Sequence, residues 1–253
     1  MPGFHSGASS ARTGRGHRSA IREEEFHRGR GRSIAAWLED PYCAVDGEIA
    51  AVYGRLVDEL RGAGARIDEG VHPVPLAEGH DVAQRQIQGA MSRWLPDEAF
   101  QSLLERAAAA PADDNTPPVR WARHITQRAR EHQFAAEHRL RLKAAWTNFF
   151  RDHDVLLCPV TPTPAIPHDQ NPDIDARTVT VNGATRPYGD QWAWLQAVGV
   201  VHLPVAVTPV GRTSAGLPVG IQIVAPHLED RTAIDVAARI ADIVGGFQAP
   251  PGF

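Results

Sequence analysis

The chain has 253 residues, of which 43% are hydrophobic, so it is long enough to bury a sizeable core as one large domain or two small ones. Its formal net charge of −4 and pI near 6.3 exclude a general electrostatic attraction to nucleic acid or to anionic membranes. No run of about 18 apolar residues occurs, and the first residues lack the apolar stretch of a secretory signal, so we expect a soluble, cytoplasmic protein without a membrane partner.

Residues 1–32 differ in composition from the rest of the chain, because they are rich in Gly, Ser, Arg and His and contain almost no aliphatic residues. Such a segment cannot bury enough apolar surface to offset the entropy lost on ordering, so we predict a disordered tail. An Arg- and Gly-rich tail can attract RNA or DNA, but only Phe4 and Phe26 are available to stack on bases, which favours a solvated tail and no nucleic-acid partner. We therefore place the domain boundary between residues 1–32 and residues 33–253.

The first half of the ordered region is predicted to be a strand–helix–strand unit followed by helices. The apolar run at 34–38 indicates a buried strand, and Asp46 is placed to cap a helix that ends at Gly62 and Gly64, before a weak strand at 66–68. Residues 76–110 have helical periodicity interrupted at Pro96, and residues 119–150 predict one long helix. The inward stripe of that long helix is expected to be Trp121, Ile125, Ala129, His132, Ala136 and Leu140.

The second half is predicted to contribute buried strands and a terminal helix. Residues 154–160 form an apolar run typical of a strand buried on both faces, and the proline-rich residues 161–167 should cross the end of the sheet as a stiff extended segment. A hairpin is expected at 177–185 around Asn182-Gly183, followed by a short helix that Asp190 caps. Residues 205–210 and 219–224 indicate an antiparallel pair of strands, and a terminal helix should run from Asp230 to Gly245-Gly246. The inward positions of the terminal helix are expected to be Ile234, Ala237, Ala238, Ile240 and Ala241.

Few residues are suited to redox, metal or proton-transfer chemistry. Cys43 and Cys158 lie in hydrophobic surroundings, which favours buried, reduced thiols over a disulfide or a metal site. Among the 26 Lys and Arg residues there is a single lysine, Lys143, which is expected on the surface of the long helix. The histidines of that helix are spaced by eight and six residues and do not converge on one face, so we expect no metal and no other cofactor. These three histidines are His124, His132 and His138.

The loop at 161–168 is the segment best suited to contact a ligand, because loops at strand ends form pockets and aromatic side chains line them. The alternative is that the nearby tryptophans belong to the core. No catalytic residue is predicted, since the pairs His153-Asp154 and His168-Asp169 occur without a G-x-S-x-G nucleophile pattern. The predicted substrate-binding residues are Thr161, Thr163, Trp192 and Trp194.

The sequence HLPVAVTPVG at 202–211, followed by GLPVGIQIVAP at 216–226, closely resembles the carboxyl-terminal strand pair of the amidase signature family. The sequences DVLLCPVTPTPA at 154–165 and IAAWLEDPYCAVD at 34–46 resemble two further segments of that family in the same order. The resemblance covers residues 33–253. It implies an α/β class and part of an α/β/α fold in which helices flank a mixed β-sheet.

The same resemblance implies hydrolysis of linear carboxylic amides, with release of ammonia or an amine, by a Ser, cis-Ser, Lys triad. The triad belongs to the half of the family fold that precedes the segments matched in this chain. Ser9-Ser10 only superficially resembles the serine pair, because Arg12 follows where the family has small residues. Lys143 comes too late in the chain to correspond to the family's lysine, and arginine does not give up a proton at working pH.

Three hypotheses follow. The first is an amidase-like chain that is inactive alone and binds a small-molecule amide once the missing half completes the site. The second is a noncatalytic module that binds a partner chain or forms a homo-oligomer, because an incomplete sheet leaves apolar edges to be covered. The third, an amidotransferase in a tRNA-charging complex, is disfavoured because the ordered region has no basic stripe.

Overall fold

We describe a computed structural model of the chain over residues 33–249; the predicted disordered tail at 1–32 lies outside the described residues, as do residues 250–253. The α-helices of the described part are α2 (Gly47–Gly62), α3 (Leu76–Met91), α4 (Asp97–Ala109), α5 (Pro117–Ile125), α6 (Ala129–Phe149), α7 (Ala193–Gly199) and α8 (Asp230–Val244). The strands are β1 (Ser33–Ala36), β2 (Arg66–Glu69), β3 (Val155–Pro159), β4 (Thr178–Val181), β5 (Ala184–Pro187), β6 (Val205–Arg212) and β7 (Pro218–Val224). Short 3-10 helices are η1 (Ser92–Trp94), η2 (Ile174–Ala176) and η3 (Tyr188–Trp192).

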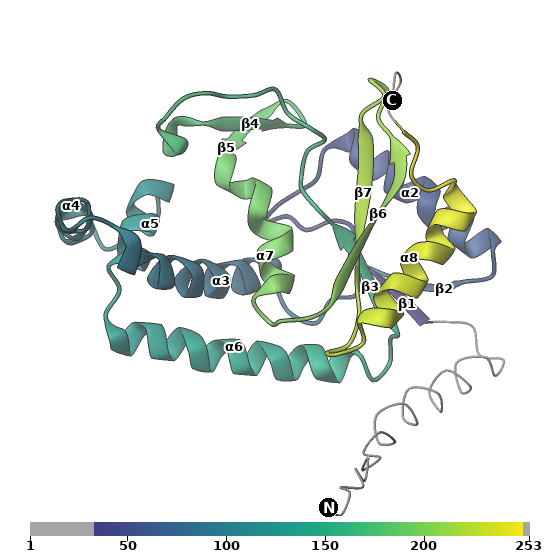
Figure 1. Cartoon of the computed structure of the whole chain (residues 1–253), viewed down its shortest axis with the longest axis horizontal. Helices are drawn as coiled ribbons and strands as arrows, with labels where there is room; N and C mark the ends of the chain where they lie inside the picture. The colour runs from purple at the N-terminus through teal and green to yellow at the C-terminus, as the bar shows by residue number, and fades with distance from the viewer. Residues whose placement is uncertain (1–32, 250–253) are drawn as a thin grey trace, which may run out of the picture. The chain divides into compact units, whose positions relative to one another are not determined.

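The central sheet is mixed and has five strands in the order β2-β1-β3-β7-β6. Strands β2, β1 and β3 are parallel, whereas β7 is antiparallel to both β3 and β6. Helices α2 and α8 cover one face of this sheet, and α7 covers the other, with α3 and α6 beyond it (Figure 1). The fold is therefore α/β with a mixed sheet between helical layers, as the sequence predicted.

The centre of the core is strand β3, whose residues are all buried. This burial confirms the predicted strand at 155–159, whereas Asp154 and Val160 at its predicted ends are half-buried and lie outside β3. The burial follows from the position of β3 between a parallel and an antiparallel neighbour. The predicted antiparallel pair is also confirmed, with Val205 opposite Val224 and a bulge between Pro209 and Gly211. Strand β6 is an edge strand, the position at which a proline such as Pro209 is tolerated. Within residues 33–249, no helix is both long and apolar enough to cross a membrane.

Two predicted local structures are confirmed, the Asp46 cap of α2 and the Asn182-Gly183 turn that lies against it. The Asp46 side chain accepts a hydrogen bond from the backbone of Glu48 and caps the helix. Asn182 and Gly183 both have positive φ, of 52° and 78°, in the turn between β4 and β5. The Asn182 side chain also accepts from Gly47 N at 2.8 Å and donates to Val45 O at 3.0 Å. The hairpin is thus tied to the start of α2.

The single long helix predicted at 119–150 is wrong, because the chain breaks between α5 and α6. At the break, Gln127 Nε2 donates to the carbonyls of Arg85 and His124, and Arg128 N donates to the Glu131 carboxylate. These hydrogen bonds with side chains take the place of the backbone hydrogen bonds that a continuous helix would form at the break. The interruption changes the phase of the pattern, so Leu140 is 61% exposed whereas Trp146 is fully buried.

Two predictions at helix starts and faces are also wrong. Asp190 does not cap α7, since it lies within η3 and its carboxylate accepts from Arg186 Nε at 2.7 Å. In α8 the buried residues are Ala233, Val236 and Ile240. Ile234, predicted to face inward, is 62% exposed because α8 contacts β6 along a narrower stripe than the full apolar pattern suggests. The Gly245 end of α8 is confirmed, with a left-handed φ of 91°.

Candidate functional site

The turn after β3 is held against the start of α2 and against η3. Asp46 N donates to Pro162 O at 2.8 Å, and the Thr161 hydroxyl donates to Thr163 O at 2.7 Å. Gln191 Nε2 donates to the Thr163 hydroxyl oxygen at 2.6 Å. Thr163 is 4% exposed, so this turn is a fixed part of the structure rather than a free loop.

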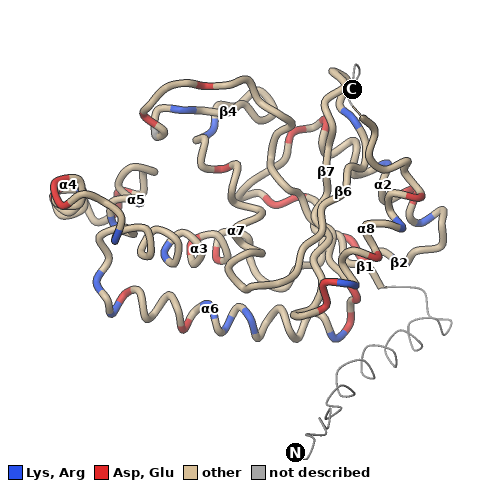
Figure 2. The backbone as a smooth tube through the Cα atoms, in the orientation of Figure 1, with Lys and Arg blue, Asp and Glu red and all other residues tan. Residues whose placement is uncertain are grey.

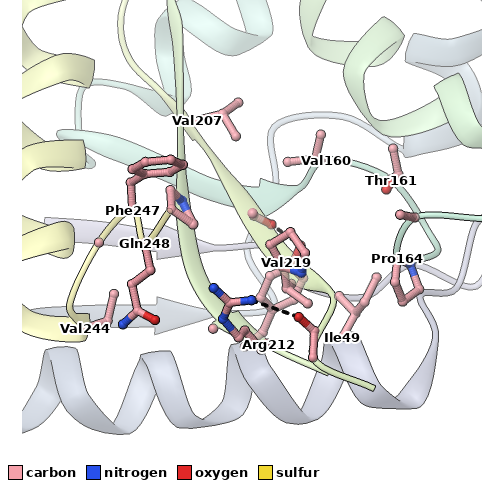
Figure 3. A pocket seen from close by; sticks show the side chains of 18 of the residues that line it. Ile49, Val160, Thr161, Pro164, Val207, Arg212, Val219, Val244, Phe247 and Gln248 are labelled. Atoms are coloured by element: carbon pink, nitrogen blue, oxygen red, sulfur yellow. Dashed lines mark hydrogen bonds between the residues drawn. The ribbon is translucent and has the colours of Figure 1, made fainter. Parts of the chain in front are cut away.

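Thr161 and Thr163 line a cavity of about 940 Å³ beside the edge strand β6. Five segments form its wall: α2, the turn after β3, strand β6, strand β7 with the connection before it, and the end of α8 with the residues that follow it. Figure 3 shows Phe247 and Gln248 at one end of the cavity and Thr161 and Pro164 at the other. The lining is mostly apolar, which is typical of pockets that bind small organic molecules.

The two predicted tryptophans do not line this cavity. Trp194 is fully buried in the core, where its indole N–H donates to Cys43 O at 3.0 Å and its ring meets Trp37 edge-on at 5.1 Å. Trp192 is half-buried and packs edge-on against Tyr188 at 5.3 Å. Trp192 directly follows Gln191, the partner of Thr163. The structure thus brings Thr161 and Thr163 together at the cavity, whereas neither tryptophan lines it.

Sequence reasoning missed several lining residues that come from distant parts of the chain. Tyr53 of α2 donates from its hydroxyl to Gly220 O at 2.9 Å. Burial raises the pKa of this phenol well above its usual range, so Tyr53 stays neutral and serves as a donor. Arg212 at the end of β6 and Phe247 after α8 also line the cavity. The glycines of the strand pair were the signal in the sequence that could have indicated this packing. A Cβ on Gly211 would lie 2.8 Å from Val52 Cγ1, so glycine allows β6 to approach α2 closely.

Proton-transfer groups are not assembled at this cavity. The serines of the described part are Ser33, Ser92, Ser102 and Ser214. They lie in four separate segments, and within residues 33–249 none of them hydrogen-bonds to Lys143 on α6. Ser214 instead donates to the Glu48 carboxylate. The described residues therefore do not form the serine–lysine arrangement of the amidase signature family.

Two buried histidines lie in the helical layer away from the cavity. Burial, followed by the Arg120 charge, lowers the pKa of His80 to about 4. Burial, followed by the Arg85 charge, lowers the pKa of His124 to about 4. The Tyr42 hydroxyl lies 2.9 Å from His80 Nδ1. Both imidazoles are neutral near pH 7 and act as hydrogen-bonding core groups.

No group of three or more His, Cys, Asp or Glu side chains is placed to hold a metal ion within the described ranges. His153 is hydrogen-bonded to Asp68, with 3.1 Å between His153 Nε2 and Asp68 Oδ2. Cys43 and Cys158 are free, buried thiols. Burial raises the pKa of Cys43 to about 12 and raises that of Cys158 further, which leaves both thiols protonated and unreactive.

The fold is of the α/β class and has a mostly apolar cavity at the edge of its mixed sheet. The Amidase family model matches residues 10–234, so the chain belongs to the amidase signature family. That match also includes residues 10–32, which lie outside the described residues.

Curated relatives match the chain over part of its length. An indoleacetamide hydrolase of Bradyrhizobium japonicum is 33% identical over 103 residues, covering 40% of this chain and 20% of that protein. An acylamidase of Rhodococcus erythropolis is 30% identical over 94 residues, covering 37% of this chain and 19% of that protein. A glutamyl-tRNA(Gln) amidotransferase subunit of Tropheryma whipplei is 32% identical over 111 residues, covering 44% and 19% respectively. These matches span about a fifth of the length of the relatives.

Solved structures share the fold at low sequence identity. A bacterial aryl acylamidase of the amidase signature family superposes with a TM-score of 0.60 at 19% identity, covering 85% of this chain and 44% of that chain. A 6-aminohexanoate cyclic dimer hydrolase superposes with a TM-score of 0.60 at 19% identity, covering 86% and 46%. The chain thus spans less than half of these structures.

Proposed function

We propose that this chain forms the scaffold and one substrate-binding wall of a site that hydrolyses linear carboxylic amides, and that residues 33–249 do not supply the catalytic groups. The observation that carries the proposal is the cavity beside β6, which is built from the segments that resemble the amidase signature family and has neither serine nor lysine among its described lining residues. In this proposal Thr161 and Thr163 contact the amide. Trp192 and Trp194 support them from behind, because Gln191 bonds Thr163 and Trp194 anchors the adjacent helix.

The names of the relatives support an amide as the substrate class. Indoleacetamide hydrolase and acylamidase are both named for the cleavage of amides. The family resemblance supplies the proposed chemistry: attack by a serine, proton relay through a second serine and a lysine, and release of ammonia or an amine, without a cofactor. Lys143 cannot perform the relay from α6 in the described arrangement, and the many arginines keep their protons.

The test is hydrolysis of benzamide by the purified chain, measured as ammonia release. We expect no release above the buffer rate, and no change with Lys143→Ala or with the matched control Arg141→Ala, which alters the same helix. Hydrolysis that Lys143→Ala abolishes and Arg141→Ala retains would show that this chain carries its own relay, and the proposal would then fail.

The second candidate is a noncatalytic module that binds a partner chain or a second copy. It is favoured by the edge strand β6, where Val205 is 39% and Val207 is 57% exposed. The match to a protein named as one component of an amidotransferase is consistent with it. Sedimentation showing a well-folded monomer at micromolar concentration would count against this candidate.

A nucleic-acid partner receives no support from the charge distribution. Along α6 the acidic residues Glu131 and Glu137 lie between Arg130 and the basic residues Arg139, Arg141 and Lys143, so the basic residues do not form a stripe along the whole helix (Figure 2). Tight, salt-sensitive binding of tRNA would support a nucleic-acid partner.

We also propose a cytoplasmic location, which the two free thiols support.

A further inference from the structure

The cavity beside β6 combines a large apolar surface with one cationic group. Among the described residues that line it, Arg212 at the end of β6 is the only one with a charged side chain. Figure 3 shows this arginine among apolar lining residues such as Val219 and Ile49. A ligand that fits the cavity therefore meets hydrocarbon over most of its surface and a guanidinium at one place.

Arg212 has most of its hydrogen-bonding capacity free. Its Nη1 donates to Gly216 O at 3.0 Å, and a guanidinium carries five N–H donors. Within residues 33–249, no carboxylate forms an ion pair with Arg212. Glu48, next to Ile49 on α2, directs its carboxylate to the hydroxyl and the backbone N–H of Ser214, the latter at 3.2 Å.

We propose that the cavity binds amides whose apolar body carries a free carboxylate, and that Arg212 is the group that binds this carboxylate. The inference rests on the proposed function, since it names the substrate class of the same cavity. An arginine matches the two oxygens of a carboxylate with two parallel N–H donors, whereas a neutral amide offers one weaker acceptor. Val207, Val219 and Phe247 supply the apolar contact for the remainder of the ligand.

The test compares two ligands of nearly the same shape, the anionic 4-phenylbutyrate and the neutral 4-phenylbutyramide, titrated into the purified full chain by calorimetry. We expect the carboxylate to bind about tenfold more tightly than the amide, as a charge-assisted hydrogen bond provides. In Arg212→Gln this preference should disappear, because glutamine keeps a neutral N–H donor but removes the positive charge. Arg239→Gln is the control, because Arg239 lies on α8 outside the cavity and pairs with Asp235.

A second variant locates the binding. Ala165 is exposed and lines the cavity, so Ala165→Trp should fill part of the space without disturbing the core, and both ligands should then bind at least about tenfold more weakly. Circular dichroism would confirm that each variant folds.

Three results would overturn the inference. Equal affinity of the two ligands for the unmodified chain, or a preference that survives Arg212→Gln, would refute the role of Arg212 and leave the proposed function standing. Binding that Ala165→Trp does not weaken would place the ligand elsewhere. If benzamide also failed to bind, the use of this cavity in the proposed function would fall as well.

Discussion

Two buried tryptophans should respond differently to the same substitution. Trp194 and Trp146 are both fully buried, but the Trp194 indole N–H donates to Cys43 O whereas Trp146 Nε1 has no partner within the described part of the chain. Replacement by phenylalanine removes one ring from each site, at a cost of about 1–2 kcal/mol for the space left behind. In Trp194→Phe the buried Cys43 carbonyl also loses its partner, which costs about 1–3 kcal/mol more.

Trp146→Phe instead removes a buried donor that is already unsatisfied, which offsets part of the lost packing. We therefore expect Trp194→Phe to lower the free energy of unfolding by about 2 kcal/mol more than Trp146→Phe does. Urea unfolding followed by far-UV circular dichroism measures both values without relying on tryptophan fluorescence. Equal losses in the free energy of unfolding, or a larger loss in Trp146→Phe, would refute the hydrogen bond from the Trp194 indole to Cys43 O. The proposed role of this bond in holding α7 would then fall as well.

Three further predictions concern pH, thiols and the hairpin. His80 and His124 have folded pKa values of about 4, below the unfolded value of about 6.5. Their contribution to the free energy of unfolding is therefore present above pH 6.5, and it falls by about 2 kcal/mol per histidine between pH 7 and pH 5. His124→Gln should remove about half of that loss in urea titrations, and identical stability at both pH values would contradict the burial argument. Cys43 and Cys158 should react with a thiol reagent such as dithionitrobenzoate only after denaturation, so rapid native-state labelling would contradict their protonated, buried state. Asn182→Ala should lower stability by about 1 kcal/mol, since it removes the hydrogen bonds of Asn182 with the exposed Gly47 N–H and with the Val45 carbonyl, and unchanged thermal unfolding would refute this.

The strands were predictable because their signals are local. The apolar run of β3 and the Asn182-Gly183 turn each depend on neighbouring residues, and the structure has them where the sequence places them. The long helix failed because Gln127 bonds the distant Arg85 carbonyl, a contact that periodicity cannot reveal. The outward direction of Ile234 likewise depends on the width of the contact between α8 and β6.

The candidate site was predictable only in part. Thr161 and Thr163 follow a recognisable strand, so their place at its end could be inferred. The remaining wall joins Tyr53, Arg212 and Phe247, which are far apart in the chain and come together only through the packing of α2 and α8 around β6. Secondary structure pattern carries no information about such convergence.

Benzamide binding followed by backbone amide chemical shifts tests the central claim most directly. We expect shifts confined to the turn at 160–165 and to the strand pair at 207–220, and their loss in Ala165→Trp. Shifts that arise elsewhere, or that persist unchanged in Ala165→Trp, would contradict the assignment of this cavity as the amide-binding wall.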